Sequence, residues 1–197
     1  MSFKNIRFFS YFKNVNPKIR ILLFTNSLVL LASYMLGPIY ALFVVDIGGD
    51  ILDAGLTVSI YALAAAITTI ISGVYADKIK ENELIIVLGY LMLGLGFFLF
   101  IFVNNILMLF AVQAFIGMGE AIYSPANNAI YSKHLSKGNA GKDWSLWEVM
   151  SYLTYIVGAT VGAYLVKNFG FDMLFLLLSG LCVFSASYIY FLPRKAL

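Results

Sequence analysis

The sequence is poor in the side chains that catalysis, metal binding and solubility in water require. It contains one cysteine, Cys182, and one histidine, His134, among 197 residues. A disulfide framework or a metal site built on His and Cys therefore cannot be assembled within one chain. Charged residues make up 12% of the chain, against about 25% in soluble globular domains. Neither a Gly-x-Ser-x-Gly motif nor a phosphate-binding loop is present. We expect neither an enzyme nor a protein with a metal or cofactor.

Apolar residues dominate the chain instead. They account for 61% of it, against roughly 45–50% in soluble domains, which is too much for a chain of this length to hide from water. Six apolar runs each come close to the ~20 residues that cross ~30 Å of hydrocarbon. The sequence therefore predicts an all-α membrane protein. Its parts are a basic, aromatic arm at 1–19, a tail at 193–197, and a bundle at 20–192 with spans at about 20–45, 54–76, 84–103, 106–131, 144–166 and 173–192.

The basic residues are distributed unevenly along this predicted topology. Of 13 Lys and Arg residues, all except Lys167 lie in the arm, the loops after the second and fourth spans, and the tail. Lys and Arg accumulate in cytoplasmic segments, so we predict cytoplasmic N- and C-termini in a plasma (inner) membrane. The arm suits the anionic surface of a lipid bilayer. Nucleic-acid binding is the alternative, and we expect none because the basic residues follow the membrane topology.

The loop after the second apolar run carries the first recognisable motif. Gly73, Ala76 and Asp77 are followed by Lys78 and, two residues later, Lys80. This stretch resembles the loop between helices 2 and 3 of the major facilitator superfamily, Gly-x-Leu-Ala-Asp-Arg-x-Gly-Arg-Arg. The glycine, alanine and aspartate match, and Lys78 keeps the charge, whereas Lys80 replaces the second glycine. The resemblance implies that Gly73, Asp77 and Lys78 form a cytoplasmic gate.

The fourth apolar run carries a second resemblance to the same family. Leu109-x-x-x-Gln113-x-x-Ile116-Gly117-x-Gly119-Glu120-Ala121 aligns without gaps to the family pattern Leu-x-x-x-Arg-x-x-Gln-Gly-x-Gly-Ala-Ala. Gln113 stands where the family commonly has an arginine tied to proton coupling. Gln113, Gly117 and Glu120 are spaced i, i+4 and i+7, on one helical face. An ionisable group at membrane depth is costly unless it is neutral, paired or facing water. Gln113 and Glu120 are therefore candidates for a cavity or a proton-linked site; the alternative for Glu120 is a protonated acid bonded to a neighbouring helix.

Other polar residues indicate which helical faces line a cavity. In the first span, Asn26, Ser33 and Tyr40 recur every seven residues, and Gly37-Pro38 predicts a kink because proline removes a backbone hydrogen bond. Asn26 is a further candidate for the cavity or a proton-linked role. Candidate lining residues are Ser33, Tyr61, Thr68 and Tyr155. The third and sixth spans have almost no polar side chains beyond Ser and Tyr, so we expect them to face lipid.

Small residues spaced four apart in membrane helices are more often packing surfaces than binding sites. Gly158 and Gly162 fit this description, and Gly117 is also assigned to helix packing. Gly162-Ala163-Tyr164-x-x-Lys167 moreover repeats Gly73-Val74-Tyr75-x-x-Lys78. Such a repeat fits a 3+3 inverted arrangement of the six spans, as in many secondary transporters. Chance similarity is the alternative.

The family resemblance implies a function that composition alone does not. Family members have twelve helices in two halves around a central site, and the six spans here correspond to the N-terminal half. We expect a secondary active transporter or half-transporter that moves a small molecule by alternating access, with proton coupling left open. The implied partner is a second six-helix half, supplied by a homodimer or a separate chain. The alternative is a truncated or non-transporting membrane scaffold.

Overall fold

The computed structural model describes residues 16–78, 81–136, 138 and 140–192, without the side chains of Ala76 and Asp77. Within these ranges five helical segments are long and apolar enough to cross a membrane. Residues 1–15 of the predicted arm and the tail at 193–197 lie outside the described residues. The elements, in chain order, are α2 (Pro17–Leu36), the 3-10 turn η2 (Gly37–Ile39), α3 (Tyr40–Asp46), α4 (Ile51–Lys78), α5 (Asn82–Leu99), the 3-10 turn η3 (Phe100–Phe102), α6 (Ile106–Lys133) and α7 (Ala140–Tyr190).

Two of the helices begin at asparagine caps. The side chain of Asn16 accepts a hydrogen bond from the backbone N–H of Lys18 at 3.0 Å, and Pro17 occupies the first helical position of α2. The side chain of Asn105 accepts from the N–H of Met108 at 2.9 Å at the start of α6. These bonds satisfy backbone donors that have no partner inside the first turn. The sequence therefore encodes both starting points locally.

The first membrane segment is interrupted where the sequence places Gly37-Pro38. α2 ends at Leu36, the chain forms the 3-10 turn η2, and the α-helix resumes at Tyr40 as α3. Pro38 has no N–H to donate to the preceding turn, so the α-helix cannot run through it without losing a hydrogen bond. The predicted kink is confirmed.

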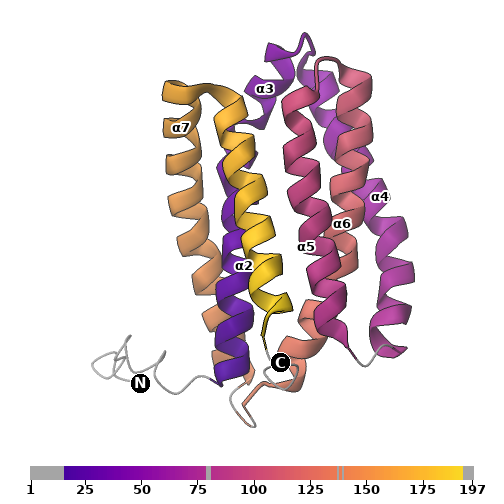
Figure 1. The fold of residues 1–197 in the computed structure, drawn as a ribbon, viewed down its shortest axis with the longest axis vertical. Coiled ribbons are helices and arrows are strands. Elements are labelled where there is room, and N and C mark those ends of the chain that lie inside the picture. Colours follow the sequence, from indigo (N-terminus) through magenta and orange to yellow (C-terminus); the bar gives the residue numbers. More distant parts are fainter. Residues whose placement is uncertain (1–15, 79–80, 137, 139, 193–197) are drawn as a thin grey trace.

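The 51-residue helix α7 is too long to cross a membrane once, since it would measure about 75 Å if straight. Its backbone leaves helical geometry at Gly170, where φ is 81° and ψ is 176°. Only glycine adopts this conformation without strain. The chain folds back at this point, and the arms 140–169 and 171–190 lie side by side (Figure 1).

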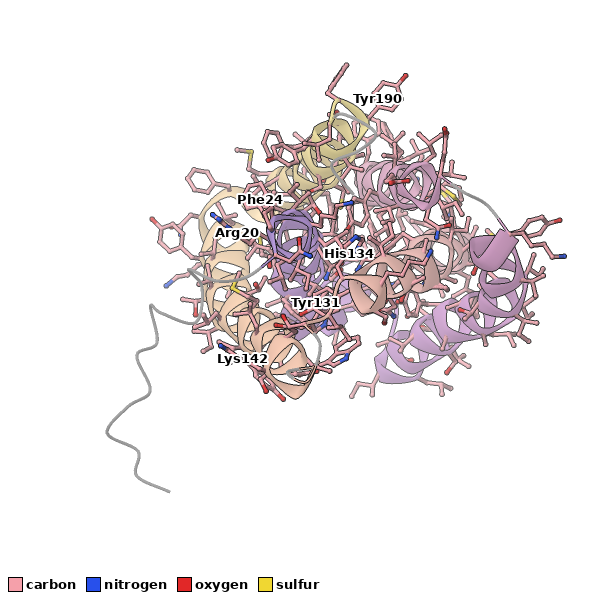
Figure 2. The ribbon with its side chains drawn as sticks, turned by 90° about the horizontal axis from the view of Figure 1, so that it is seen from below. Arg20, Phe24, Tyr131, His134, Lys142 and Tyr190 are labelled. Carbon is pink, nitrogen blue, oxygen red and sulfur yellow. The ribbon has the colours of Figure 1, made fainter. Side chains whose placement is uncertain are left out.

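The main helix contacts give the order α2, α7, α5, α6, α4. α2 lies against α7, α4 lies against α6, and α5 contacts both α6 and α7. Near the end of the bundle that holds α3, the rings of Phe43, Phe100 and Phe175 pack with centroids 4.9–5.6 Å apart. Figure 2 views the opposite end, where α2 starts and α6 ends, and shows Arg20, His134 and Lys142 there.

The expectation that the third span faces lipid is wrong for half of its apolar window. Half of the apolar window of α5 is buried, the largest share among the five candidate spans of the described residues. Glycines bring α5 close to α6: a Cβ on Gly89 would lie 2.6 Å from the Cβ of Tyr123, and one on Gly96 would overlap Ile116. An exposed face remains along Leu88 and Leu91. A lack of polar side chains therefore did not indicate exposure to lipid, because small residues let this helix pack inside the bundle.

Candidate functional site

A cavity of about 240 Å³ lies between four parts of the bundle: the α2–η2–α3 segment, α4, the α5–η3 segment and α6. Its polar lining consists of Ser33, Tyr40, Tyr61, Gln113 and Glu120. The other lining residues are Leu36, Gly37, Val58, Phe97, Phe100 and Ile116. The cavity therefore has apolar and aromatic walls with a few polar groups, which is the usual composition of a small-molecule site.

Glu120 and Tyr61 form the central polar pair of this cavity. The Tyr61 hydroxyl on α4 donates a hydrogen bond to Oε2 of Glu120 on α6. The helices can approach this closely because Gly117, one turn before Glu120, packs on the backbone of Tyr61, and any Cβ there would overlap its carbonyl oxygen. Hydrogen bonding and access to a cavity reduce the cost of placing a carboxyl group among apolar helices.

Tyr40 lines the cavity, but its hydroxyl group is buried. Tyr40 is 9% exposed, and its hydroxyl oxygen is buried with no hydrogen-bond partner among the described residues. The side chains of Thr57 and Gln113 are its polar neighbours. The Thr57 hydroxyl already donates to the backbone carbonyls of Asp53 and Ala54, at 3.1 and 2.8 Å. The Tyr40 hydroxyl is therefore enclosed by protein, beside two side chains whose oxygens can accept a hydrogen bond from it.

Three of the predicted cavity residues lie elsewhere. Asn26 is buried in the core, where its side-chain oxygen faces the Tyr90 hydroxyl at 3.4 Å. Thr68 is half-buried on α4 and does not line the cavity. Tyr155 is exposed on α7, with its ring edge-on to that of Tyr34 at 4.9 Å between centroids. The seven-residue spacing in the first span thus located Ser33 and Tyr40 but not Asn26.

Of the residues assigned to the cytoplasmic gate, Gly73 and Lys78 do not line the cavity. Gly73 is half-buried, with no atom within 4 Å of the place where a Cβ would lie. Lys78 is exposed at the end of α4. The side chain of Asp77 lies outside the described residues. The gate therefore stays a prediction.

The glycines of the first arm of α7 pack against α2. A Cβ on Gly158 would lie 3.0 Å from the Cβ of Tyr34, and a Cβ on Gly162 would overlap the backbone of Met35. Gly73 has open space where its proposed repeat partner Gly162 has none. The two copies of the short repeat therefore do not share the same packing role within this chain.

A hydrogen bond between α4 and α6 was not evident from the sequence motifs. Pro125 lies inside α6 and has no N–H to donate to the carbonyl of Ala121, four residues earlier. The buried hydroxyl of Ser72 on α4 donates to that carbonyl at 2.5 Å. The signal in the sequence was the proline, which predicts a carbonyl without its helical partner but does not say which side chain reaches it.

Membrane-length apolar helices around a cavity that holds a carboxyl group define an integral membrane protein with a polar site inside its bundle. The chain matches the Major Facilitator Superfamily over residues 22–197 and belongs to this family of membrane transporters. The resemblance noted around Asp77 and in the fourth span is thereby confirmed. Proteins of this family are not normally enzymes.

Two multidrug resistance proteins are similar in sequence to most of this chain. The chain is 27% identical over 164 residues to the multidrug resistance protein MdtH of Yersinia pestis (strain Pestoides F). The same protein of Yersinia pseudotuberculosis serotype O:1b (strain IP 31758) gives the same identity. In both comparisons the match covers 83% of this chain and 40% of the relative. The chain therefore spans about two fifths of the length of the relatives it matches.

Proposed function

We propose that this chain forms half of a secondary active transporter that moves a small molecule by alternating access. The observation that supports this most directly is the carboxyl group of Glu120, bonded to Tyr61, at a cavity between α2, α4, α5 and α6. A carboxyl group at membrane depth is typical of substrate or proton pathways. Family membership supports the same class of activity.

The proposed topology has six spans, with each arm of α7 crossing the membrane once. The bundle then covers 20–192, between a cytoplasmic arm at 1–19 and a cytoplasmic tail at 193–197. The basic residues Arg20 and Lys142 lie at the same end of the molecule (Figure 2), which supports that end as cytoplasmic. In this topology spans 1–3 and 4–6 form an inverted repeat in the plasma (inner) membrane, and Asp77, Gly73 and Lys78 face the cytoplasm.

Glu120 is the proposed proton-linked residue, and Gln113 shares its cavity. The ionisable side chains that interact with the Glu120 carboxyl are Tyr61, which donates to it, and Tyr123 on α6. Gain and loss of a proton at Glu120 would make or remove a charge inside an apolar bundle. Such a change in charge can link a proton gradient to the movement of a solute.

Everted membrane vesicles test this proposal. A respiration-driven pH gradient is monitored with a quenched dye while cationic, neutral and anionic drug-like compounds are added in turn. We expect at least one compound to dissipate the gradient in vesicles with the wild-type chain and not in vesicles with Glu120→Gln. Glu148→Gln, an exposed acid on α7, is the matched control and keeps the wild-type response. Equal responses from wild type and Glu120→Gln would exclude a coupling role for Glu120.

The partner we propose is a second six-helix half, as a homodimer or a separately encoded chain. Only 6% of the apolar window of α4 is buried, so the surface of this helix that faces away from α6 is open to a partner within the described residues. The chain also spans only 40% of the length of its relatives. A non-transporting scaffold is the competing function, and it predicts no gradient-linked flux for any compound, with or without a partner chain.

A further inference from the structure

We propose that a groove beside the ends of the first and last spans binds one anionic phospholipid, with an acyl chain along the end of α7 and the phosphate group at Arg20 on α2. This site is separate from the cavity that contains Glu120. From the proposed function it takes only the topology, which assigns the lipid to the cytoplasmic leaflet. Two independent observations support it: the composition of the groove, and a base beside it that has no acidic partner.

The groove follows the last turns of the second arm of α7. It has a volume of about 350 Å³ and is lined by Phe184, Ser187, Tyr188, Phe191 and Leu192. These positions are spaced i, i+3, i+4, i+7 and i+8, so they form one helical face. Phe184 is 54% exposed and Phe191 is 81% exposed. An exposed groove with apolar and aromatic walls on a membrane helix suits part of an acyl chain.

The helix α2 borders this groove through an aromatic contact. The ring of Tyr188 lies edge-on to that of Phe24 on α2, with 5.7 Å between centroids. On its own helix Tyr188 also contacts Phe184, at 6.4 Å between centroids. Tyrosine is enriched where the acyl region of a bilayer meets the headgroups, because its ring is apolar and its hydroxyl is polar. The groove therefore lies at the depth where a phospholipid has its chains on one side and its phosphate on the other.

A positive charge lies on the headgroup side of this aromatic contact. Arg20 is exposed one helical turn before Phe24, on the same face of α2 (Figure 2). Within the described residues Arg20 forms no ion pair, and no Asp or Glu occurs among residues 1–45 or 173–197. The sequence places further bases nearby: Lys18 precedes Arg20, and Arg194 and Lys195 follow the groove residues. A guanidinium group binds phosphate oxygens in pairs, and basic surfaces at the cytoplasmic leaflet favour anionic lipids.

Lipid binding by the purified full chain tests the charge. The chain in mild detergent is mixed with equal amounts of phosphatidylglycerol and phosphatidylcholine that carry identical acyl chains, and native mass spectrometry measures the first lipid bound. We expect the wild type to bind phosphatidylglycerol about fivefold more tightly, as for one basic residue at an anionic surface. Arg20→Gln should remove most of this preference. Lys133→Gln, an exposed base at the end of α6, is the matched control and should keep it.

Aromatic variants test the groove itself. Phe184→Ala and Phe191→Ala each remove apolar surface from the lining and leave Arg20 in place. We expect each to weaken the binding of both lipids by about fivefold and to leave the ratio between the lipids unchanged. Phe169→Ala removes a ring that is 62% exposed beside the break at Gly170, and it should change neither value.

A photoactivatable lipid locates the site on the chain. Phosphatidylglycerol with a diazirine in its acyl chain is crosslinked to the wild-type chain in nanodiscs, and the labelled peptides are identified. We expect label on a peptide that contains residues 184–192. Label on other segments only would overturn the proposal and leave the groove to another occupant, such as the basic arm at 1–19 or a second copy of the chain.

The binding data can also overturn the proposal. Equal binding of the two lipids by the wild type would contradict it, and so would a preference that survives in Arg20→Gln. If Arg20→Gln does not fold, the wild-type comparison and the position of the photolabel decide. None of these measurements uses transport, so a failure of the proposed function would leave the lipid site standing, and the reverse also holds.

Discussion

The helices α4 and α5 differ in a way that reverses the relation expected in a membrane, where the more polar helix should lie inside the bundle. α4 carries Tyr61 and Ser72, yet only 6% of its apolar window is buried and it lies at the edge of the bundle (Figure 1). α5 has almost no polar side chains in its apolar window, yet half of that window is buried. In water the more apolar helix would be driven inward. In lipid that driving force is absent, because lipid chains are as apolar as leucine.

The two helices are held by different interactions. α5 packs by shape, with Gly89 and Gly96 against α6. α4 is joined to α6 by two hydrogen bonds, Tyr61 to Glu120 and Ser72 to the carbonyl of Ala121, and by the fit of Gly117 on its backbone. α5 is therefore held mainly by close packing of small residues, whereas α4 is held to α6 by hydrogen bonds and one glycine contact.

The largest effect should come from filling a glycine contact of α5. In Gly89→Leu, the new side chain would overlap Tyr123 and the carbonyl of Gly119, 2.6 and 2.8 Å from the ideal Cβ. We expect the free energy of unfolding in mixed micelles to fall by about 3 kcal/mol or more, the upper range for overpacking. Gly55→Leu on α4, where nothing lies within 4 Å, should change it by less than about 0.5 kcal/mol. Similar losses for both variants would remove the contrast between the helices.

A smaller effect is expected at the hydrogen bond between α4 and α6. Ser72→Ala leaves the carbonyl of Ala121 without a donor, because Pro125 cannot supply one. The cost should be about 1 kcal/mol, as for hydrogen bonds between membrane helices. Pro125→Ala restores a backbone N–H four residues after Ala121, so Ser72→Ala should cost much less in that background. A double-mutant cycle on unfolding in mixed micelles measures the coupling, and strictly additive losses would show that the two residues do not share this carbonyl.

The smallest expected effect is the yield of a disulfide crosslink between two chains. This experiment tests whether the exposed face of α4 contacts a partner. Two tagged copies are co-expressed with Cys182 replaced by alanine, one carrying Leu63→Cys on α4 and the other Ile156→Cys on α7; both positions are 63% exposed. Oxidation in native membranes should give an adduct between the two tags in the homodimer form of our proposal. Leu88→Cys, on the exposed face of α5, replaces Leu63→Cys as the control and should give none. Absence of any adduct would contradict the homodimer form.

Four of the residues that line the cavity were predicted from the sequence. Gln113 and Glu120 were found from helical spacing on one face, and Ser33 and Tyr61 from polar positions in apolar runs; all four line the cavity. Asn26 shares the seven-residue spacing of Ser33 but lies in the core beside Tyr90. Residue spacing indicates which face of a helix a side chain occupies. The same face of a helix contacts different neighbouring helices at different positions along its length. The aromatic wall residues Phe97 and Phe100 were missed because aromatic residues are common throughout the chain.

The amino-acid sequence by itself determined the membrane class, the positions of the apolar helices, the break at Gly37-Pro38 and the family. These follow from local chemistry: hydrophobic length, backbone donors, and short motifs such as the one around Asp77. The tertiary structure alone decided that α5 lies inside and that Tyr61 bonds Glu120. These depend on how closely glycine surfaces let helices approach, which is a property of pairs of helices and cannot be read from one.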